Sequence, residues 1–407
     1  MNTTPFSSKR TVRRLAVARL ISIGGGAAAY TALMSTVYEL TRSPTWLSAT
    51  LFVTFGVGGL ISPLAGALGD RIDRRRVMIA SDLLGAACFV GMAFVTQDRW
   101  WLLGLAFVSA VVETPFWSAS GAAIPNLVGP EDLSWANGLV SLGRNAGVMV
   151  GPAVGGLLVA GFGPAWVFGL NAATFLVSAV LVASVRGRFA GERTDAQEHR
   201  GARAGFRFIA HDRVLRTMVL AWVTLVSGMG FVMVADRPLA DIFHVGAIGF
   251  GLLITSWGAG SVLGSLAGRW LNEDKEPKAL FLGTMLVALT TAAISVSPWF
   301  APILVMAMLS GIGDAVVLVA EQGIQQRRTP DAVRSRVMAA SDAVITVSYA
   351  ASLLFAGAVL RAVGPQHVYA IGGATAAIGA IVLLPVVRSA RAGERASAAS
   401  AETVVAE

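Results

Sequence analysis

Charge and cysteine are both scarce in this chain. Only 14% of its 407 residues are charged, and it contains one cysteine and four histidines. A soluble domain of ordinary composition carries about 25% charged residues, so this chain has too little charge to cover a water-exposed surface. One cysteine cannot form a disulfide framework, and so few cysteines and histidines exclude a Cys/His metal cluster. The single cysteine, Cys88, lies in an apolar run, and we expect it to be buried.

Motifs of the common enzyme classes are absent as well. The sequence has no GxSxG elbow, no HExxH zinc motif and no phosphate-binding P-loop. It also has no basic patch interleaved with aromatic residues, the pattern typical of proteins that bind nucleic acid. We therefore expect neither an enzyme nor a nucleic-acid-binding protein, and we expect no cofactor and no metal.

Long apolar runs dominate the chain, which is 55% hydrophobic. A helix needs about 20 apolar residues to cross the hydrocarbon core of a bilayer. On this scale the sequence predicts an all-α membrane protein with about twelve transmembrane helices. The predicted spans are 14–40, 46–69, 76–96, 100–125, 134–160, 164–185, 214–240, 246–270, 278–298, 300–325, 334–360 and 366–387.

Lysine and arginine are distributed unevenly over the predicted loops. Placing both termini and alternate loops in the cytoplasm puts 26 of the 32 cations there, eight of them between Arg186 and Arg216. Cytoplasmic loops of membrane proteins carry such an excess, so we predict that both termini are cytoplasmic. The large excess of arginine over lysine, together with abundant alanine, is typical of a GC-rich bacterial genome, and we expect a bacterial cell membrane.

A polar centre and an internal repeat suggest the domain boundaries. The polar stretch ends in AGFRFIAHDRVLR, which alternates apolar and basic residues like a helix lying on a membrane surface. Short strings recur at an offset of about 200, such as PLAG at 63–66 and SLAG at 265–268. The prediction is a cytoplasmic tail at 1–13, a six-helix bundle at 14–185, a cytoplasmic linker with an amphipathic helix at 186–213, a second six-helix bundle at 214–388 and a disordered cytoplasmic tail at 389–407.

The loop between the second and third spans, GALGDRIDRRRVM, is densely charged. It resembles the major facilitator superfamily signature of Gly, three residues, Asp, Arg, one residue, Gly and two basic residues. The matching residues are Gly66, Asp70, Arg71, Arg74 and Arg75. The resemblance implies a latch between the two halves in the outward-open state. A physical account is that Asp70 lies at the N-terminus of helix 11 near Arg334, where the helix dipole and free backbone amides favour a carboxylate. Asp73 replaces the second glycine, and we expect it to tolerate the positive φ of that position.

The fifth span contains a second motif, GVMVGPAVGGLL. It resembles the helix 5 motif that is associated, within the superfamily, with exporters that work as antiporters. The matching residues are Gly147, Gly151, Pro152, Gly155 and Gly156. Small residues let helices approach closely and proline bends a helix, so we expect this face to pack against the other half and pivot, although packing alone produces the same pattern.

Shorter strings resemble one branch of the superfamily. They are ANGL at 136–139, RRTPDAVRSRVMAA before helix 11 and the stretch before helix 7. This branch is the drug:proton antiporter branch that includes macrolide efflux proteins and the enterobactin exporter. The resemblance implies proton-coupled efflux of a hydrophobic or amphipathic drug, antibiotic or siderophore-like metabolite by a monomer working through alternating access. Two alternatives are a symporter or facilitator that imports a small metabolite and a receptor that does not transport.

Ionisable groups inside the spans are costly and therefore candidates for function. Glu113 and Arg144 lie near mid-membrane and are the predicted proton-coupling partners, because a buried carboxylate holds its proton and a nearby guanidinium favours its release. Asp314 occupies the position related to Glu113 by the repeat. Arg19 and Asp82 are shallower, and we expect a structural ion pair between them. Further ionisable groups are Glu321 and Asp342 toward the cytoplasm, and Glu39, Asp236 and Arg237 near the outer ends.

The substrate is expected to contact aromatic and methionine side chains. Such residues suit bulky apolar or amphipathic ligands. The candidates in the helices that line the central cavity of such a fold are Tyr30, Phe116, Trp117, Trp222, Met229, Met233 and Trp257.

Overall fold

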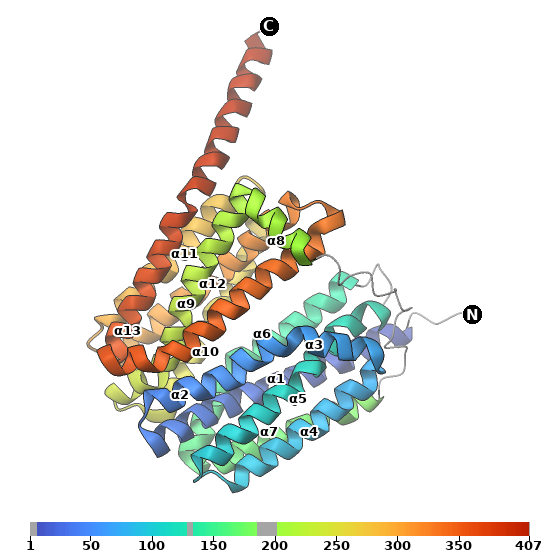
Figure 1. Cartoon of the computed structure of the whole chain (residues 1–407), viewed down its shortest axis with the longest axis vertical. Coiled ribbons are helices and arrows are strands. Elements are labelled where there is room, and N and C mark those ends of the chain that lie inside the picture. The colour runs from blue at the N-terminus through green and yellow to red at the C-terminus, as the bar shows by residue number, and fades with distance from the viewer. Residues whose placement is uncertain (1–5, 128–132, 185–201, 407) are drawn as a thin grey trace. The chain divides into compact units, whose positions relative to one another are not determined.

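The computed structural model describes residues 6–127, 133–184 and 202–406, and every element within these ranges is helical (Figure 1). The first half of the chain contains α1 (Phe6–Thr41), α2 (Pro44–Leu51), the π-helical turn η1 (Phe52–Val57), α3 (Gly58–Arg71), α4 (Arg74–Phe94), α5 (Arg99–Leu127), α6 (Leu133–Phe162) and α7 (Pro164–Ser184). The second half contains α8 (Ala202–His211), α9 (Arg213–Ile242), α10 (Gly246–Ser265), the 3₁₀ turn η4 (Leu266–Trp270), α11 (Glu276–Ser295), α12 (Phe300–Arg328) and α13 (Asp331–Ala406).

The described helices confirm the predicted set of spans. Eleven helical segments are long and apolar enough to cross a membrane, and one of them, Val333–Arg388, has 56 residues. This segment is interrupted at Gly364, whose φ of 79° lies outside the helical region. Because Pro365 follows directly and Gly364 alone adopts the positive φ, the segment consists of two spans joined by a tight break. The described helices then contain twelve spans.

The helices form two compact units. Unit 1 contains Met1–Asp195, Val234–Gly258 and Leu353–Ala362, and unit 2 contains Ala196–Met233, Ala259–Ser352 and Val363–Glu407. The units therefore do not coincide with the predicted bundles at 14–185 and 214–388. The difference arises because parts of α9, α10 and α13 pack on the first six spans.

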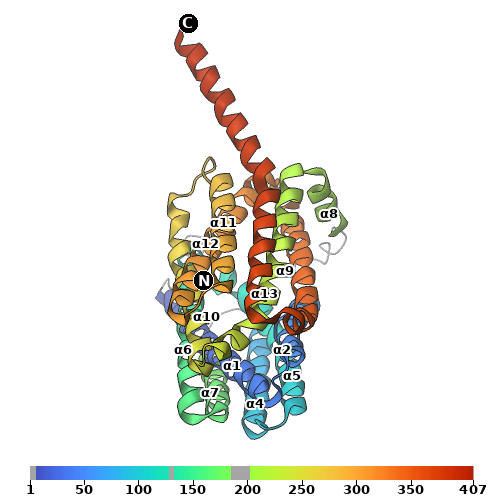
Figure 2. The same cartoon turned by 90° about the vertical axis from the view of Figure 1, so that its left-hand side faces the viewer.

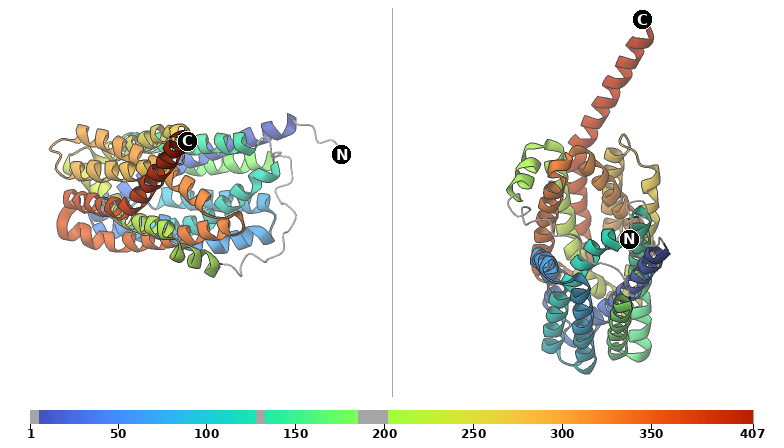
Figure 3. Two further views of the ribbon diagram at one scale, coloured as in Figure 1. Left: turned by 90° about the horizontal axis from the view of Figure 1, so that it is seen from above. Right: turned by 90° about the vertical axis from the view of Figure 1, so that its right-hand side faces the viewer.

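Aromatic and small side chains form the core of unit 1. Helix α1 packs against α6 and α7, and α4 packs against α5 and α7 (Figures 2 and 3). Phe89 of α4 stacks on Phe175 of α7 with ring centroids 5.6 Å apart, and Phe168 completes the cluster. Cys88 is buried beside this region, as the sequence predicts. The packing fixes the neighbouring charged side chains of α1, α4 and α5.

In unit 2, α11 packs closely on α12. A Cβ atom added at Gly313 would lie 2.8 Å from the backbone oxygen of Gly283, so the two backbones meet at these glycines. Helix α8 is the predicted amphipathic helix, and its Ile209 packs with Leu215 and Val337. Its apolar side is thus covered at least partly by protein.

The end of α13 differs from the prediction of a disordered tail. The helix continues through residues 389–406 to Ala406 and extends beyond the neighbouring helices of unit 2 (Figure 1). The segment is rich in alanine, glutamate and arginine, which have high helix propensity, and this explains the helical state.

Candidate functional site

The loop motif ends in a helix cap. Asp73 has φ −56°, and its carboxylate accepts a hydrogen bond from the Arg76 amide at 3.0 Å, so Asp73 is the N-cap of α4. The expected positive φ is wrong, because capping and not left-handed geometry accounts for aspartate at this position. The side chains of Gly66, Asp70 and Arg71 lie outside the described residues, and their role as a latch stays a prediction.

The basic end of the motif binds a neighbouring helix. Arg75 donates a hydrogen bond to the backbone oxygen of Ala183, and Arg14 donates one to the backbone oxygen of Ser184 at 3.2 Å. Both oxygens belong to the last turn of α7, where free carbonyls and the helix dipole attract cations. Arg75 therefore attaches α4 to α7. Arg74 is half-buried at the first position of α4.

The glycines of the α6 motif face two different helices. Added Cβ atoms at Gly151 and Gly155 would lie 2.5 Å from the backbone oxygens of Gly24 and Ala28 of α1. An added Cβ at Gly156 would instead lie 2.5 Å from the backbone oxygen of Ala247 of α10. Gly147 also faces α1. Most of the motif thus packs inside the first six spans, which corrects the expectation that its face packs against the other half.

Pro152 marks the contact of α6 with α10. The Ala153 amide next to it donates a hydrogen bond to Thr255 Oγ1 at 3.1 Å, and Gly251 packs on the Pro152 carbonyl. Threonine side chains commonly satisfy backbone groups that proline frees in membrane helices. This part of the motif does contact a helix from the second half of the chain, as expected.

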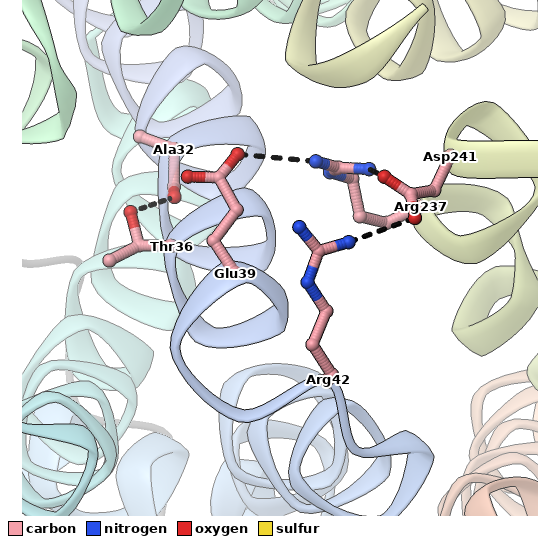
Figure 4. Close-up of polar contacts among 6 residues, drawn as sticks. All are labelled: Ala32, Thr36, Glu39, Arg42, Arg237 and Asp241. Atoms are coloured by element: carbon pink, nitrogen blue, oxygen red, sulfur yellow. Dashed lines mark hydrogen bonds and ion pairs between the residues drawn. The ribbon is translucent and has the colours of Figure 1, made fainter. Parts of the chain in front are cut away.

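An ion-pair cluster joins the end of α1 to α9 (Figure 4). Arg237 is only 2% exposed and lies 3.2 Å from Glu39 and 3.5 Å from Asp241. Arg42 pairs with Asp241 at 2.8 Å. The guanidinium groups of Arg42 and Arg237 both lie 5.1 Å from the ring centroid of Tyr38. We call Glu39, Arg42, Arg237 and Asp241 the ion-pair cluster.

Arg42 occupies an unusual backbone position in this cluster. Its φ is 47°, in the left-handed region where glycine commonly ends a helix, and its amide donates to the Tyr38 carbonyl at 2.7 Å. Slight desolvation lowers the pKa of the Arg42 guanidinium, but the charge and hydrogen bond of Asp241 outweigh it and raise that pKa above its ordinary value. The group is therefore cationic at physiological pH. The sequence indicated Glu39 and Arg237 but not Arg42 and Asp241, because the pairing joins residues about 200 positions apart.

Glu113 does not pair with Arg144 among the described contacts. Its carboxylate accepts a hydrogen bond from Ser109, one turn earlier on α5, and it lies close enough to Asp82 of α4 for the two groups to interact electrostatically. Asp82 is 1% exposed. The structure thus brings two carboxyl groups together and not the predicted carboxylate and guanidinium.

The expected ion pair between Arg19 and Asp82 is also absent from the described contacts. Arg19 Nε instead donates to Ser120 Oγ at 2.7 Å, and its guanidinium lies 5.9 Å from the Trp117 ring centroid. Among the described charged groups, Arg144, another cation, interacts with Arg19. The structure therefore groups these four charges by sign, with Asp82 near Glu113 and Arg19 near Arg144. Ser120 of α5 thus accepts the hydrogen bond of Arg19, for which the sequence suggests the carboxylate of Asp82.

Asp314 and Glu321 lie seven residues, or about two turns, apart on α12. Asp314 is half-buried and has no hydrogen bond or ion pair among the described contacts. Glu321 is buried and interacts electrostatically with Asp342 of α13. The helix thus places Glu321 against its neighbours. No three His, Cys, Asp or Glu side chains in the described part of the chain come together as a metal site.

The predicted substrate residues have different environments. Phe116 is buried in a core cluster of unit 1 and Trp222 packs against the core of unit 2, so these two serve packing. Trp117 is 43% exposed. Tyr30 makes an edge contact with Phe55, at a centroid distance of 5.5 Å. The remaining candidates, Met229, Met233 and Trp257, are half-buried.

Comparison with known proteins connects these features to a family. A family model described as a transmembrane secretion effector matches residues 5–406. The enterobactin exporter EntS of Shigella boydii serotype 4 (strain Sb227) is 27% identical over 353 residues, covering 83% of this chain and 82% of that protein. EntS of Escherichia coli O1:K1 / APEC is 26% identical over 351 residues, with the same coverage.

Solved structures share the fold. A mutant of the nucleoside transporter NupG matches with a TM-score of 0.77 and 12% identity, covering 92% of this chain and 99% of that chain. A bacterial homologue of the iron transporter ferroportin in the inward-facing state matches with a TM-score of 0.70 and 17% identity, covering 92% and 98%. Together with the matched family model, the twelve spans and the loop motif, these similarities show that the chain belongs to the transmembrane secretion effector family, a group of major facilitator superfamily transporters of small molecules and not of enzymes.

Proposed function

We propose that this protein exports an amphipathic small molecule, of the drug, antibiotic or siderophore-like class, from the cytoplasm across a bacterial inner membrane. The observation that carries the proposal is its similarity to enterobactin exporters over 83% of the chain and 82% of theirs. The cation distribution supports cytoplasmic termini. One chain contains both six-span halves of the repeat, so a monomer suffices.

Alternating access requires contacts that form and break. In the proposed orientation the ion-pair cluster lies at the periplasmic end, and it closes that end through Arg237, Glu39 and Asp241. The α6–α10 contact at Pro152 lies in the same unit. Opening to the outside must separate these groups, while the predicted latch at Asp70, Arg71, Arg74 and Arg75 of the loop motif would hold the opposite end.

Proton uptake is the proposed energy source. Glu113 and Asp314 are the proposed carriers, since both are ionisable, lie within spans and have no cationic partner among the described contacts. Asp82 adds a second carboxyl group beside Glu113. Exchange of a proton at such groups changes the charge buried in each half, and this change can bias the rocking equilibrium. The protein would then act as a proton antiporter.

Transport in proteoliposomes tests this proposal. A panel of fluorescent dyes, macrolides and siderophores would be loaded, and efflux would be measured with and without a pH gradient. We expect gradient-stimulated efflux that falls about tenfold in Glu113→Gln and in Asp314→Asn. Glu273→Gln, which removes an exposed carboxylate in the loop before α11, is the matched control.

Three results would contradict parts of the proposal. An efflux rate that is the same with and without the pH gradient, and in both variants, would exclude proton coupling through these residues. Uptake driven by the gradient, without efflux, would favour the importer. Binding without any transport would favour a receptor.

A further inference from the structure

Two arginines of the first half have no acidic partner among the residues that the structure describes. Arg19 of α1 and Arg144 of α6 lie where these two helices pack together, since a Cβ atom added at Gly143 would lie 3.1 Å from the Ala16 carbonyl oxygen and 3.5 Å from Leu20 Cβ. Their like charges interact, and the described residues include no carboxylate paired with either. We call them the arginine pair. Cations inside membrane proteins normally pair with acids or line a water-filled path. The arginine pair therefore requires an anion from another source or access to water.

Arg144 is exposed, but its position around α6 shows that it does not face lipid. Consecutive helical residues are about 100° apart, so Arg144 lies about 120° away from Val150 and 140° from Leu157. Val150 is 50% exposed and Leu157 is 58% exposed, and they mark the lipid-facing side. Arg144 is exposed on a different side, between the α1 contact of Gly147 and the α10 contact of Met149.

Trp117 lies on a side of α5 that faces away from lipid. Nine residues separate it from the exposed Val108, which turns the helix through about 180° and places the two side chains on opposite sides. Trp117 is nevertheless 43% exposed, and the guanidinium of Arg19 lies 5.9 Å from its ring centroid. An accessible aromatic surface thus adjoins the arginine pair on a side that does not face lipid.

Ser120 positions Arg19 for a ligand. The Ser120 hydroxyl accepts a hydrogen bond from Arg19 Nε at 2.7 Å, and this is the hydrogen bond that Arg19 makes among the described contacts. Arg19 as a whole is 9% exposed, and the two terminal nitrogens of its planar guanidinium have no partner among the described contacts. Carboxylates, phenolates and phosphates match such a fork with two parallel hydrogen bonds.

We propose that the arginine pair and Trp117 bind the anionic group of the substrate, and that the substrate is an organic anion with an aromatic or similarly flat apolar part. The inference deepens the proposed function, on which it rests, by naming the charge of the exported molecule. An anion relieves the repulsion between Arg19 and Arg144, while the indole supplies apolar contact. An inside-negative membrane potential favours the exit of an anion, which agrees with export.

Equilibrium binding of a matched pair of probes tests this inference without transport. The full chain, in nanodiscs of neutral phosphatidylcholine, would be titrated with radiolabelled 1-naphthoate and with its uncharged counterpart 1-naphthamide. We expect naphthoate to bind at least tenfold more tightly. Arg144→Gln and Arg19→Gln should remove this preference, and Arg144→Lys should restore part of it, since lysine keeps the charge but not the fork.

Arg213→Gln provides the control, because Arg213 is an exposed arginine at the start of α9. Its affinity for naphthoate should be unchanged, and elution on size exclusion should be the same for all variants. Equal binding of the two probes, or naphthoate binding that survives Arg144→Gln, would overturn the proposal.

A lipid headgroup is the other source of such an anion. The titration is therefore repeated in nanodiscs that contain phosphatidylglycerol. Loss of naphthoate binding there would assign the pair to lipid phosphate and overturn the substrate assignment, whereas unchanged binding supports it. Naphthoate binding without any efflux would contradict the export proposal alone. Efflux with no preference for anions would contradict the anion site alone.

Discussion

The two halves of the chain differ in the charge that surrounds related positions. In the first half, Ser120 lies seven residues after Glu113 on α5, and in the second, Glu321 lies seven residues after Asp314 on α12. Ser120 holds Arg19 of the arginine pair, whereas Glu321 interacts with another carboxylate, Asp342. The internal repeat thus retains a carboxylate at one depth. Two turns further along the helix, the first half has a serine that binds a cation of α1, and the second half has a carboxylate that faces another carboxylate.

The difference shows which properties the repeat fixes. Helix lengths are set by the span of the bilayer that both halves must cross, so they recur. The charge beside the mid-membrane carboxylate is not needed for packing, so it can differ between the halves and complement the charge of the ligand. An asymmetric ligand with one anionic group needs only one cationic half.

Reversing the charge of Arg144 should remove the difference in charge between the two halves and cause the largest loss of anion binding. Arg144→Glu makes the first half acidic like the second, and the new carboxylate repels an anion near Arg19. We expect anion binding to fall about 100-fold, equivalent to roughly 2.7 kcal/mol. Titration with 1-naphthoate measures the loss. Retention of affinity would mean that the anion does not contact α6.

A smaller effect is expected when Ser120 is replaced by the residue of the related position. Ser120→Glu would neutralise Arg19, whose Nε already donates to the serine hydroxyl at 2.7 Å. The affinity for naphthoate should decrease about tenfold, since one of the two cations is then occupied. Ser120→Ala is the control, because it removes the hydrogen bond without adding charge. A decrease as large in the alanine variant would indicate that positioning, and not charge, matters.

The arginine pair can also be compared with Arg237, a buried arginine that has acidic partners. Arg237→Met should weaken the ion-pair cluster, because it leaves Glu39 and Asp241 without their shared cation. We expect a severalfold increase in labelling of Tyr30→Cys by a membrane-impermeant thiol reagent. Arg42→Ala should change labelling less than about twofold, because exposed ion pairs contribute roughly 0–1 kcal/mol. The reverse order would exclude Arg237 as the principal closing contact.

The smallest change is expected from the reciprocal substitution in the second half. Glu321→Ser removes the acid that is related by the repeat to Ser120. If the anion binds only the first half, naphthoate affinity should stay within about twofold, while repulsion with Asp342 is relieved. A gain of tenfold or more would show that acidic groups of the second half oppose the anion, so that both halves contribute to selectivity.

The fold could be predicted from the sequence because its signals are long and repeated. Spans follow from apolar length, and the break at Gly364 falls where a predicted span ends. Pairing among charges could not be predicted in the same way. Glu113 and Arg144 have similar depths in the sequence, but depth does not specify the direction of a side chain around its helix. Ser109 and Ser120 became the partners because they lie on the correct faces.

Local chemistry was similarly ambiguous at Asp73. Aspartate tolerates positive φ and also caps helices, and the charged sequence that follows does not distinguish these roles. The observed φ of −56° and the hydrogen bond from Arg76 identify the cap. Contacts between distant segments, such as Arg42 with Asp241, require the tertiary fold and leave no local pattern.

The isolated thiol of Cys88 has a practical consequence. It is 6% exposed inside α4, so maleimide or nitroxide reagents have little access to it in the folded protein. The natural chain can therefore serve as its own background for spectroscopy, without a preliminary substitution. Pairs of reporter groups placed at the tips of α1 and α9 would then report distance distributions for the two ends of the transport cycle in the otherwise unaltered sequence.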